Sequence, residues 1–130
     1  MRVVIGIGCD RGTSLETLET ALDQALEMAG IERSAIATLA SIDKKRDEVC
    51  LIQLAAKNSW PLIFFSAREL AQVDVPNPSE VVRKYMGTPS VGEAAALLAG
   101  RAEPNQLIIE KHKYRGADDR NATISVVRVD

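Results

Sequence analysis

The chain has 130 residues, 46% of them hydrophobic and 26% charged, and its formal net charge is −2. This length suits one domain with its own hydrophobic core, so we expect a single domain over residues 1–130. The composition excludes collagen-like, low-complexity and wholly disordered chains. Sixteen basic residues against eighteen acidic ones leave no overall positive field, so we expect no nucleic-acid partner.

Cysteine usage and apolar runs bear on the compartment. Cys9 and Cys50 form neither a disulfide framework nor a zinc quartet, which favours a reducing cytosol. The longest apolar stretch, residues 91–100, is too short for a membrane span and contains Glu93. The first residues lack the apolar run of a secretory signal. We therefore expect a cytoplasmic protein that does not contact a membrane.

The first two elements are a strand and a helix. Val3–Ile7 is a nearly continuous β-branched run, typical of an interior strand, and a glycine-containing loop follows it. Thr13 and Glu16 have the spacing of a capping box. Apolar residues at helical spacing then continue up to Gly30, which predicts a helix between these points.

The next three elements continue the alternation. Residues 35–42 and 61–65 are predicted strands, and residues 48–58 form a predicted helix between them. We expect the inner side of that helix to carry Leu51, Ile52, Leu54 and Ala55. The order up to this point is β-α-β-α-β.

The remaining residues predict three short helices and a hairpin. Cap residues followed three positions later by a carboxylate predict helices over about 67–72, 78–86 and 91–100. Apolar runs at 106–111 and 123–129, joined by a polar turn-rich segment, predict an antiparallel hairpin. The whole pattern predicts a single three-layer α/β/α domain with a mixed, mostly parallel sheet ending in that hairpin.

The loop over residues 6–14 is the most informative segment for function. Its glycines let the backbone approach a ligand, and the N–H groups at a helix start can bind an anion. Arg11 adds a planar fork suited to carboxylates, although Asp10 opposes an anion. The spacing matches neither a dinucleotide fingerprint nor a phosphate-binding P-loop. The structural alternative is that the glycines only turn the chain and Thr13 caps the helix. The residues alone do not decide between this alternative and an anion site.

Other residues with reactive or charged side chains are less specific. Cys9 near a helix start suggests a nucleophile of lowered pKa, but a buried inert thiol is the more common case. His112 cannot build a metal site alone, so we expect no metal and no cofactor. The charged run 43–48 follows the second strand, where α/β domains gather functional groups, or is only a solvated surface. Asn77 and Ser79 stand on a proline-stiffened segment suited to lining a pocket or to setting a helix entry.

Taken together, these residues resemble the cobalamin-biosynthesis family that comprises CobE and the C-terminal domain of CbiG. The matching motifs run in order from residue 6 almost to the end of the chain. They are Gly6-Ile7-Gly8-Cys9-x-Arg11-Gly12-Thr13-Ser14, Ser41-Ile42-Asp43-x-Lys45-x-x-Glu48, Phe65-Ser66-Ala67-x-Glu69-Leu70, Pro76-Asn77-Pro78-Ser79-Glu80-Val81-Val82, Gly87-Thr88-Pro89-Ser90-Val91-x-Glu93-Ala94-Ala95-Ala96-Leu97 and Lys111-His112-Lys113-Tyr114. Two departures are Asp10, where a basic residue is frequent, and Cys50, where a glycine is common.

The resemblance implies a place in the corrin branch of tetrapyrrole synthesis. CbiG proteins open the ring-A δ-lactone of cobalt-precorrin-5A and release acetaldehyde, and CobE is a short relative. A chain of this length is shorter than full-length CbiG, so the resemblance leaves two forms of a hydrolase open, the chain alone or the chain with a separate N-terminal partner. The alternative is a non-enzymatic carrier or accessory module that works with other cobalamin-pathway enzymes.

The expected partner is a corrin or precorrin intermediate, whose acetate and propionate carboxylates suit basic groups and backbone donors. For lactone opening, Asp43 or Glu48 is the candidate general base and Lys45 a candidate for stabilising the oxyanion. The expected ligand-binding residues lie in the glycine loop, on the proline-stiffened segment and near the hairpin: Gly8, Cys9, Arg11, Gly12, Thr13, Ser14, Asn77, Ser79, Lys111, Lys113 and Tyr114.

Overall fold

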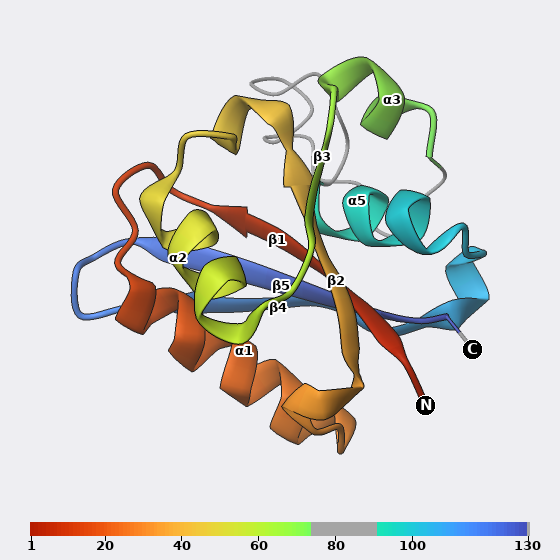
Figure 1. The fold of residues 1–130 in the computed structure, drawn as a ribbon, viewed down its shortest axis with the longest axis horizontal. Coiled ribbons are helices and arrows are strands. Elements are labelled where there is room, and N and C mark those ends of the chain that lie inside the picture. The colour runs from red at the N-terminus through yellow and green to blue at the C-terminus, as the bar shows by residue number, and fades with distance from the viewer. Residues whose placement is uncertain (74–90, 130) are drawn as a thin grey trace.

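A five-stranded sheet in the order β3-β2-β1-β5-β4 forms the centre of the computed structural model, which describes residues 1–73 and 91–129 (Figure 1). The strands are β1 (Val3–Cys9), β2 (Ile36–Ile42), β3 (Leu62–Phe65), β4 (Leu107–Arg115) and β5 (Asn121–Arg128). The helices are α1 (Leu15–Ala29), α2 (Val49–Asn58), α3 (Ala67–Ala71) and α5 (Val91–Gly100), with 3-10 turns η1 (Arg33–Ala35), η2 (Asp43–Lys45) and η3 (Pro104–Gln106).

The sheet is mixed, as predicted, but "mostly parallel" overstates its parallel part. The β1–β2 and β2–β3 pairs are parallel, whereas β5 is antiparallel to both β1 and β4. The difference arises because the hairpin places β5 directly against the central strand β1. The hairpin itself is confirmed, and its first strand continues to Arg115 instead of ending at Lys111.

Helices cover both faces of the sheet, which confirms the three-layer α/β/α prediction. In Figure 1, α1 and α2 lie mainly to the left of β2, and α3 and α5 lie to its right. Alternate residues of β1 serve the two layers: Ile5 and Ile7 belong to the apolar cluster beneath α1 and α2, and Val4 belongs to the cluster beneath α5. The central strand is therefore buried on both faces.

Two glycines let α5 lie unusually close to β1. A Cβ atom added to Gly6 would lie 1.8 Å from the backbone oxygen of Gly92 in the first turn of α5. No side chain fits in that gap, since real Cβ contacts stay above about 3 Å. The contact sets the depth of α5 on the sheet and brings its N-terminus toward the carboxyl end of β1.

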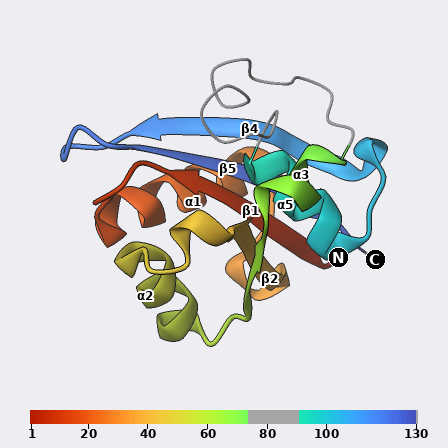
Figure 2. The ribbon, with the colours of Figure 1, turned by 90° about the horizontal axis from the view of Figure 1, so that it is seen from above.

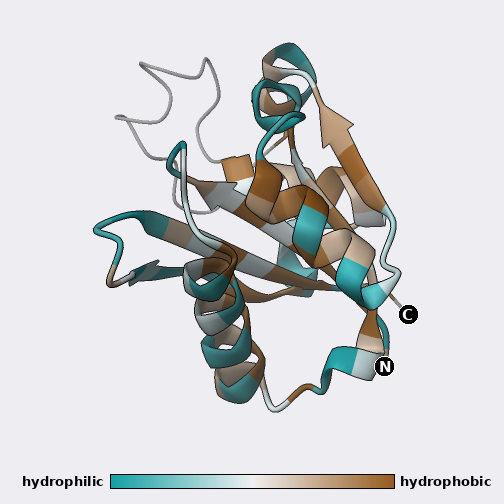
Figure 3. Ribbon diagram, turned by 60° about the vertical axis from the view of Figure 1, so that its left-hand side comes forward, coloured by the Kyte–Doolittle hydropathy of each residue, from teal (hydrophilic) through white to brown (hydrophobic). Residues whose placement is uncertain are grey.

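The N-cap of the first helix lies one residue later than predicted. Ser14 is the N-cap, and its hydroxyl accepts a hydrogen bond from the Thr17 backbone N–H at 3.1 Å. The Thr13 hydroxyl instead donates to the backbone oxygen of Asp10 at 2.6 Å, which corrects the predicted Thr13–Glu16 capping box. The helix ends as predicted at Gly30, whose φ is 68°. Figure 3 shows mainly hydrophilic residues on the exposed side of α1.

The second helix differs from prediction in the side that it buries. Ile52 is 48% exposed, whereas Cys50 is 1% exposed and takes an inner position with Leu51, Leu54 and Ala55. The predicted inward position of Ile52 is therefore wrong, because the buried stripe lies on the Cys50 side of the helix. Glu48 precedes the first turn as the N-cap.

The short helices agree with the predictions where they are described. The Ser66–Glu69 capping box of α3 is present, with both of its hydrogen bonds. Residues 91–100 are helical as predicted, and the predicted helix 78–86 lies outside the described residues. No helix in the described part of the chain is long and apolar enough to cross a membrane.

Candidate functional site

The carboxyl ends of β1 and β2 bring two sequence-predicted segments together. The loop after β1 carries Arg11 and Gly12, and the turn η2 after β2 carries Asp43 and Lys45. Adjacent parallel strands end at the same edge of a sheet, so these loops meet although about thirty residues separate them. This edge is the expected place for a ligand site in an α/β sheet.

Arg11 and Gly12 are held by acidic residues from the loop before α2. We call Arg11, Gly12, Asp47 and Glu48 the Arg11 cluster. The Arg11 Nη1 atom donates to Asp47 Oδ1 at 2.7 Å and to Glu48 Oε2 at 3.0 Å, and Nη2 donates to the Lys44 backbone oxygen. The Gly12 backbone N–H donates to Glu48 Oε1 at 2.9 Å. The donors that the sequence assigned to an external anion therefore already bind two carboxylates of the chain itself.

The two acidic members of the Arg11 cluster differ in burial. The Glu48 side chain is 6% exposed and has both oxygens engaged, whereas the Asp47 side chain is 82% exposed. The hydrogen bond from Arg11 lowers the pKa of Asp47, and the same contact raises the pKa of Arg11. Gly12 has a φ of 79°, a conformation that glycine adopts without strain. This backbone turn aims the Gly12 N–H at Glu48.

Lys45 is the most unusual residue at this edge. It is only 9% exposed, and in the part of the chain that the structure describes its Nζ has no hydrogen-bond or ion-pair partner. Its charge lies within electrostatic range of Cys9 and Asp47. The Nζ atom is not among the buried polar atoms that lack a partner in the described residues, so the stem is buried while the ammonium group reaches water. Asp43, two residues earlier, is half-buried at the start of η2.

The two cysteines, which the sequence did not associate, lie together beside Lys45. Cys9 ends β1, Cys50 lies in the first turn of α2, and their thiols are hydrogen-bonded to each other. This hydrogen bond, with burial, raises the pKa of the Cys9 thiol, and the same hydrogen bond lowers the pKa of Cys50. A raised pKa is the opposite of what a Cys9 nucleophile needs, which favours the alternative of a buried inert thiol.

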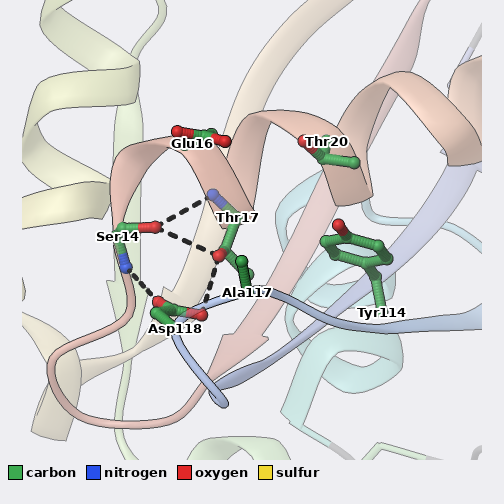
Figure 4. A pocket seen from close by; sticks show the side chains of 7 residues that line it. All are labelled: Ser14, Glu16, Thr17, Thr20, Tyr114, Ala117 and Asp118. Carbon is green, nitrogen blue, oxygen red and sulfur yellow. Dashed lines mark hydrogen bonds between the residues drawn. The ribbon is translucent and has the colours of Figure 1, made fainter.

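A second group of predicted residues surrounds the N-terminus of α1. Ser14 and Tyr114 line a hollow of about 290 Å³ with Thr17 and Asp118 (Figure 4). Asp118, on the β4–β5 turn, accepts hydrogen bonds from the Ser14 backbone N–H at 2.9 Å and the Thr17 hydroxyl at 2.8 Å. The bond from the Ser14 N–H, with that from Thr17, lowers the pKa of Asp118 to about 2. A carboxylate of the chain thus occupies the anion position at this helix start.

The hairpin turn is tied to the β1 loop at further points. Figure 2 shows the turn extending beside that loop. Asp10 accepts a hydrogen bond from the Asn121 backbone N–H at 2.7 Å, and Arg120 Nε donates to the Arg11 backbone oxygen at 3.1 Å. Asp10, which the sequence analysis set against an anion, therefore serves to anchor β5.

The remaining predicted residues are not all in one place. Lys111 pairs with Glu93 of α5 at 3.5 Å, so it lies on the face opposite α1 and Tyr114. Lys113 shares the Lys111 side of β4 by strand alternation. Gly8 lies beside Thr123, whose hydroxyl donates to its backbone oxygen at 3.3 Å. The structure thus separates the predicted hairpin contacts from the Arg11 cluster.

Asn77 and Ser79 lie outside the described residues. Among the described residues, no group of three or more His, Cys, Asp or Glu side chains is arranged to hold a metal ion. The sequence reasoning missed Asp47 and Asp118 as partners of the loop. Both lie in polar runs, and only their charge opposite the loop's donors could have pointed to them.

Comparisons with known proteins bear on this whole chain. A family model described as "Cobalamin synthesis G C-terminus" matches residues 3–127. A cobalt-precorrin-5A hydrolase from Priestia megaterium is 33% identical over 127 residues, which are 98% of this chain and 32% of the relative. Protein CobE from Sinorhizobium sp is 33% identical over 111 residues, which are 84% of this chain and 71% of that protein.

A solved structure has the same fold. CobE, described as a protein from the cobalamin (vitamin B12) biosynthetic pathway, matches with a TM-score of 0.80 and 32% identity. The match covers 97% of this chain and 93% of the solved one. The chain thus spans about a third of the length of the Priestia hydrolase but most of the length of CobE.

Proposed function

The chain belongs to the cobalamin synthesis G C-terminus family, and on that premise we propose that it binds a carboxylate-rich corrin intermediate at the carboxyl edge of its sheet. It is a cobalamin-biosynthesis protein related to cobalt-precorrin-5A hydrolases. The proposed ligand is of the precorrin or cobalt-precorrin class. Such a ring carries several acetate and propionate groups, and their carboxylates can pair with basic side chains.

The observation that carries this proposal is the place of Lys45 at this edge, with a buried stem and an ammonium group that reaches water without a partner in the described part of the chain. Such a group can pair with a carboxylate of a ligand. The adjacent Arg11 cluster provides a second basic group, and the Arg11 side chain is 54% exposed. Lys45 and Arg11 each offer a basic group to a carboxylate of the ligand, although Asp47 and Glu48 neutralise Arg11 in the chain itself.

A titration with cobyrinic acid tests the proposal. We expect the corrin absorbance to change on binding, and Lys45→Met to weaken binding by about tenfold or more, because a partly desolvated charge contact is lost. Lys57→Met is the matched control, since Lys57 is an exposed lysine that pairs with Glu19 at 2.9 Å. No absorbance change at high micromolar cobyrinic acid, or equal weakening by both variants, contradicts the proposal.

The enzymatic form of the proposal is hydrolytic opening of the ring-A lactone. Water attacks the lactone carbonyl, Glu48 or Asp43 removes its proton and passes it to the departing alkoxide, and Lys45 stabilises the oxyanion. The loop N–H groups of Gly12 and Ser14 serve only if Glu48 and Asp118 release them. The geometry supports Glu48 as an oriented carboxylate, since the Gly12 N–H and Arg11 hold both of its oxygens. Lys45 follows two residues after Asp43 in the same turn.

Substitution of the candidate bases tests this form. Asp43→Asn and Glu48→Gln keep the side-chain shape but remove the basic carboxylate, so the variant lacking the true base should release acetaldehyde about 100-fold more slowly. Acetaldehyde is measured after incubation with cobalt-precorrin-5A, with and without a separate N-terminal partner. Unchanged release by both variants removes both carboxylates from the mechanism.

The second candidate function is a carrier or accessory module for other cobalamin-pathway enzymes. The contacts of the loop favour it, because the Gly12 and Ser14 N–H groups that could stabilise an oxyanion already bind Glu48 and Asp118. Corrin binding without acetaldehyde release, together with co-purification of a pathway enzyme, is its expected result. Acetaldehyde release by the isolated chain contradicts it.

A further inference from the structure

We propose that the Asp47 carboxylate is a placeholder, which occupies on Arg11 the position that a carboxylate of the ligand takes when it binds. This inference rests on the proposed function and deepens it by naming a residue that sets the affinity of the site. It also names the contact that must open before the ligand is seated.

The two carboxylates on Arg11 are not held equally. Arg11 Nη1 is shared between Asp47 and Glu48, at 2.7 and 3.0 Å. Glu48 is also held by the Gly12 N–H at 2.9 Å, and its side chain is 6% exposed. Asp47 is held at its side chain by Arg11, and its side chain is 82% exposed. Asp47 is therefore the carboxylate that leaves most easily, and Glu48 stays in place.

The vacated position suits another carboxylate because a second positive charge reaches it. Lys45 lies within electrostatic range of Asp47 and is 9% exposed, without a partner in the described residues. A ligand carboxylate that replaces Asp47 then lies in the field of both Arg11 and Lys45. Exposed ion pairs of the Arg11–Asp47 kind are weak, so a multivalent ligand can displace Asp47.

The alternative is that Asp47 only neutralises Arg11 or steadies the loop. The two interpretations predict opposite changes in ligand affinity when the Asp47 carboxylate is removed. A supporting residue weakens ligand binding when it is removed, because the loop loses order. A placeholder strengthens ligand binding when it is removed, because a competitor for Arg11 is gone.

The experiment compares the wild type with Asp47→Asn and with Asp23→Asn at constant ionic strength. Asp23 is a matched control: its side chain is 61% exposed and pairs with Arg33 at 2.9 Å, on the middle of α1. Propane-1,2,3-tricarboxylate is the first probe, and the Gly12 amide signal in ¹⁵N NMR spectra reports its binding. Cobyrinic acid is the second probe, followed by absorbance.

We expect Asp47→Asn to bind the tricarboxylate up to about fivefold more tightly than the wild type, the range of an exposed ion pair. Asp23→Asn should leave the affinity unchanged. In an Arg11→Ala background, Asp47→Asn should bring no gain, since the contested group is absent. Equal or weaker binding by Asp47→Asn overturns the proposal, as does a site that binds no tricarboxylate in either protein.

The second probe separates this inference from the proposed function. A gain in tricarboxylate affinity with no cobyrinic acid binding supports the placeholder and contradicts the corrin ligand. Cobyrinic acid binding that Asp47→Asn leaves unchanged or weakens supports a corrin ligand and overturns the placeholder. A gain for both probes supports both.

Discussion

At the scale of single residues, Lys45 has a charge that the described part of the fold does not use. Its stem is buried, whereas its ammonium group reaches water and forms no ion pair in the described part of the chain. Its four-carbon stem still packs like an apolar side chain. The described residues do not use this charge, and the proposed function assigns it to a carboxylate of the ligand.

Lys45→Met tests through stability whether the fold uses this charge. Methionine keeps the length of the stem and removes the charge, so we expect a free energy of unfolding equal to or about 1 kcal/mol above that of the wild type. Chemical denaturation at neutral pH measures it. A clear loss of stability would show that the Lys45 charge supports the fold, and would remove the main argument for a ligand at this position.

Single residues also limit what the sequence could predict about the site. Arg11, Gly12, Lys45 and Glu48 were identified from the residues and the resemblance, and the structure brings them to one edge. Their partners could not be identified, because Asp47 is one acidic residue in a charged run until the fold places it against Arg11. The contact between Cys9 and Cys50 likewise depends on how α2 lies against β1.

At the scale of elements, the sequence predicts helices and caps that depend on neighbouring residues. It does not predict contacts between residues that are far apart in the chain. The periodicity of α1, its Gly30 end and the Ser66–Glu69 box of α3 are local, and the structure confirms them. The N-cap of α1 is local too, since the Ser14 hydroxyl accepts from the Thr17 N–H, and the prediction chose the adjacent Thr13. Asp118, more than a hundred residues away in the chain, adds a contact to the Ser14 N–H that neighbouring residues do not indicate.

The Asp118 cap predicts an acid-sensitive α1 start. The pKa of Asp118 is lowered to about 2 in the fold, against about 3.9 in an unfolded chain. A lowered carboxyl pKa contributes stability that is present above pH of about 4 and is lost as the pH falls toward 2. Asp118→Asn should therefore be less stable than the wild type at pH 6, and the difference should shrink between pH 4 and pH 2. Thermal melts across this range measure it, and parallel curves contradict the cap.

The contact between β1 and α5 makes a second prediction for elements. Gly6→Ala places a methyl group 1.8 Å from the Gly92 backbone oxygen, so α5 must move away from the sheet. We expect a loss of about 3 kcal/mol or more in unfolding free energy, at the upper end of overpacking costs. Gly30→Ala is the comparison: nothing lies within 4 Å, and only its φ of 68° opposes alanine. That variant should lose about 1 kcal/mol, and similar losses in both would contradict the close packing.

At the scale of the whole molecule, the sequence predicts the fold class but overstates the share of parallel strand pairs in the sheet. Alternating strands and helices are sufficient to predict an α/β/α domain, and Figure 3 shows the hydrophilic hairpin turn and hydrophobic β3 that the sequence pattern indicates. The position of β5 next to β1 is a property of tertiary packing, so the sequence pattern could not distinguish it from an edge hairpin. That position brings Asp118 and Arg120 to the site loop.

The molecule as a whole also divides the predicted ligand contacts. The Arg11 cluster and Lys45 lie at one edge, the Ser14 hollow is already capped by Asp118, and Lys111 is paired with Glu93 on the other face. A corrin ring that docks at the Arg11 edge therefore need not contact every predicted residue. The proposal commits to that edge, through Arg11 and Lys45.

The most direct measurement maps the binding of cobyrinic acid onto the chain by ¹⁵N NMR. The diamagnetic Co(III) form is added to labelled protein, and each backbone amide is followed. The account predicts that the largest shifts fall on Gly12 and on residues 43–48, and that the Lys57 and Asp23 amides stay in place. Shifts confined to Lys111 and Lys113, or to the Ser14 hollow, or an unchanged spectrum at high micromolar cobyrinic acid, would contradict it.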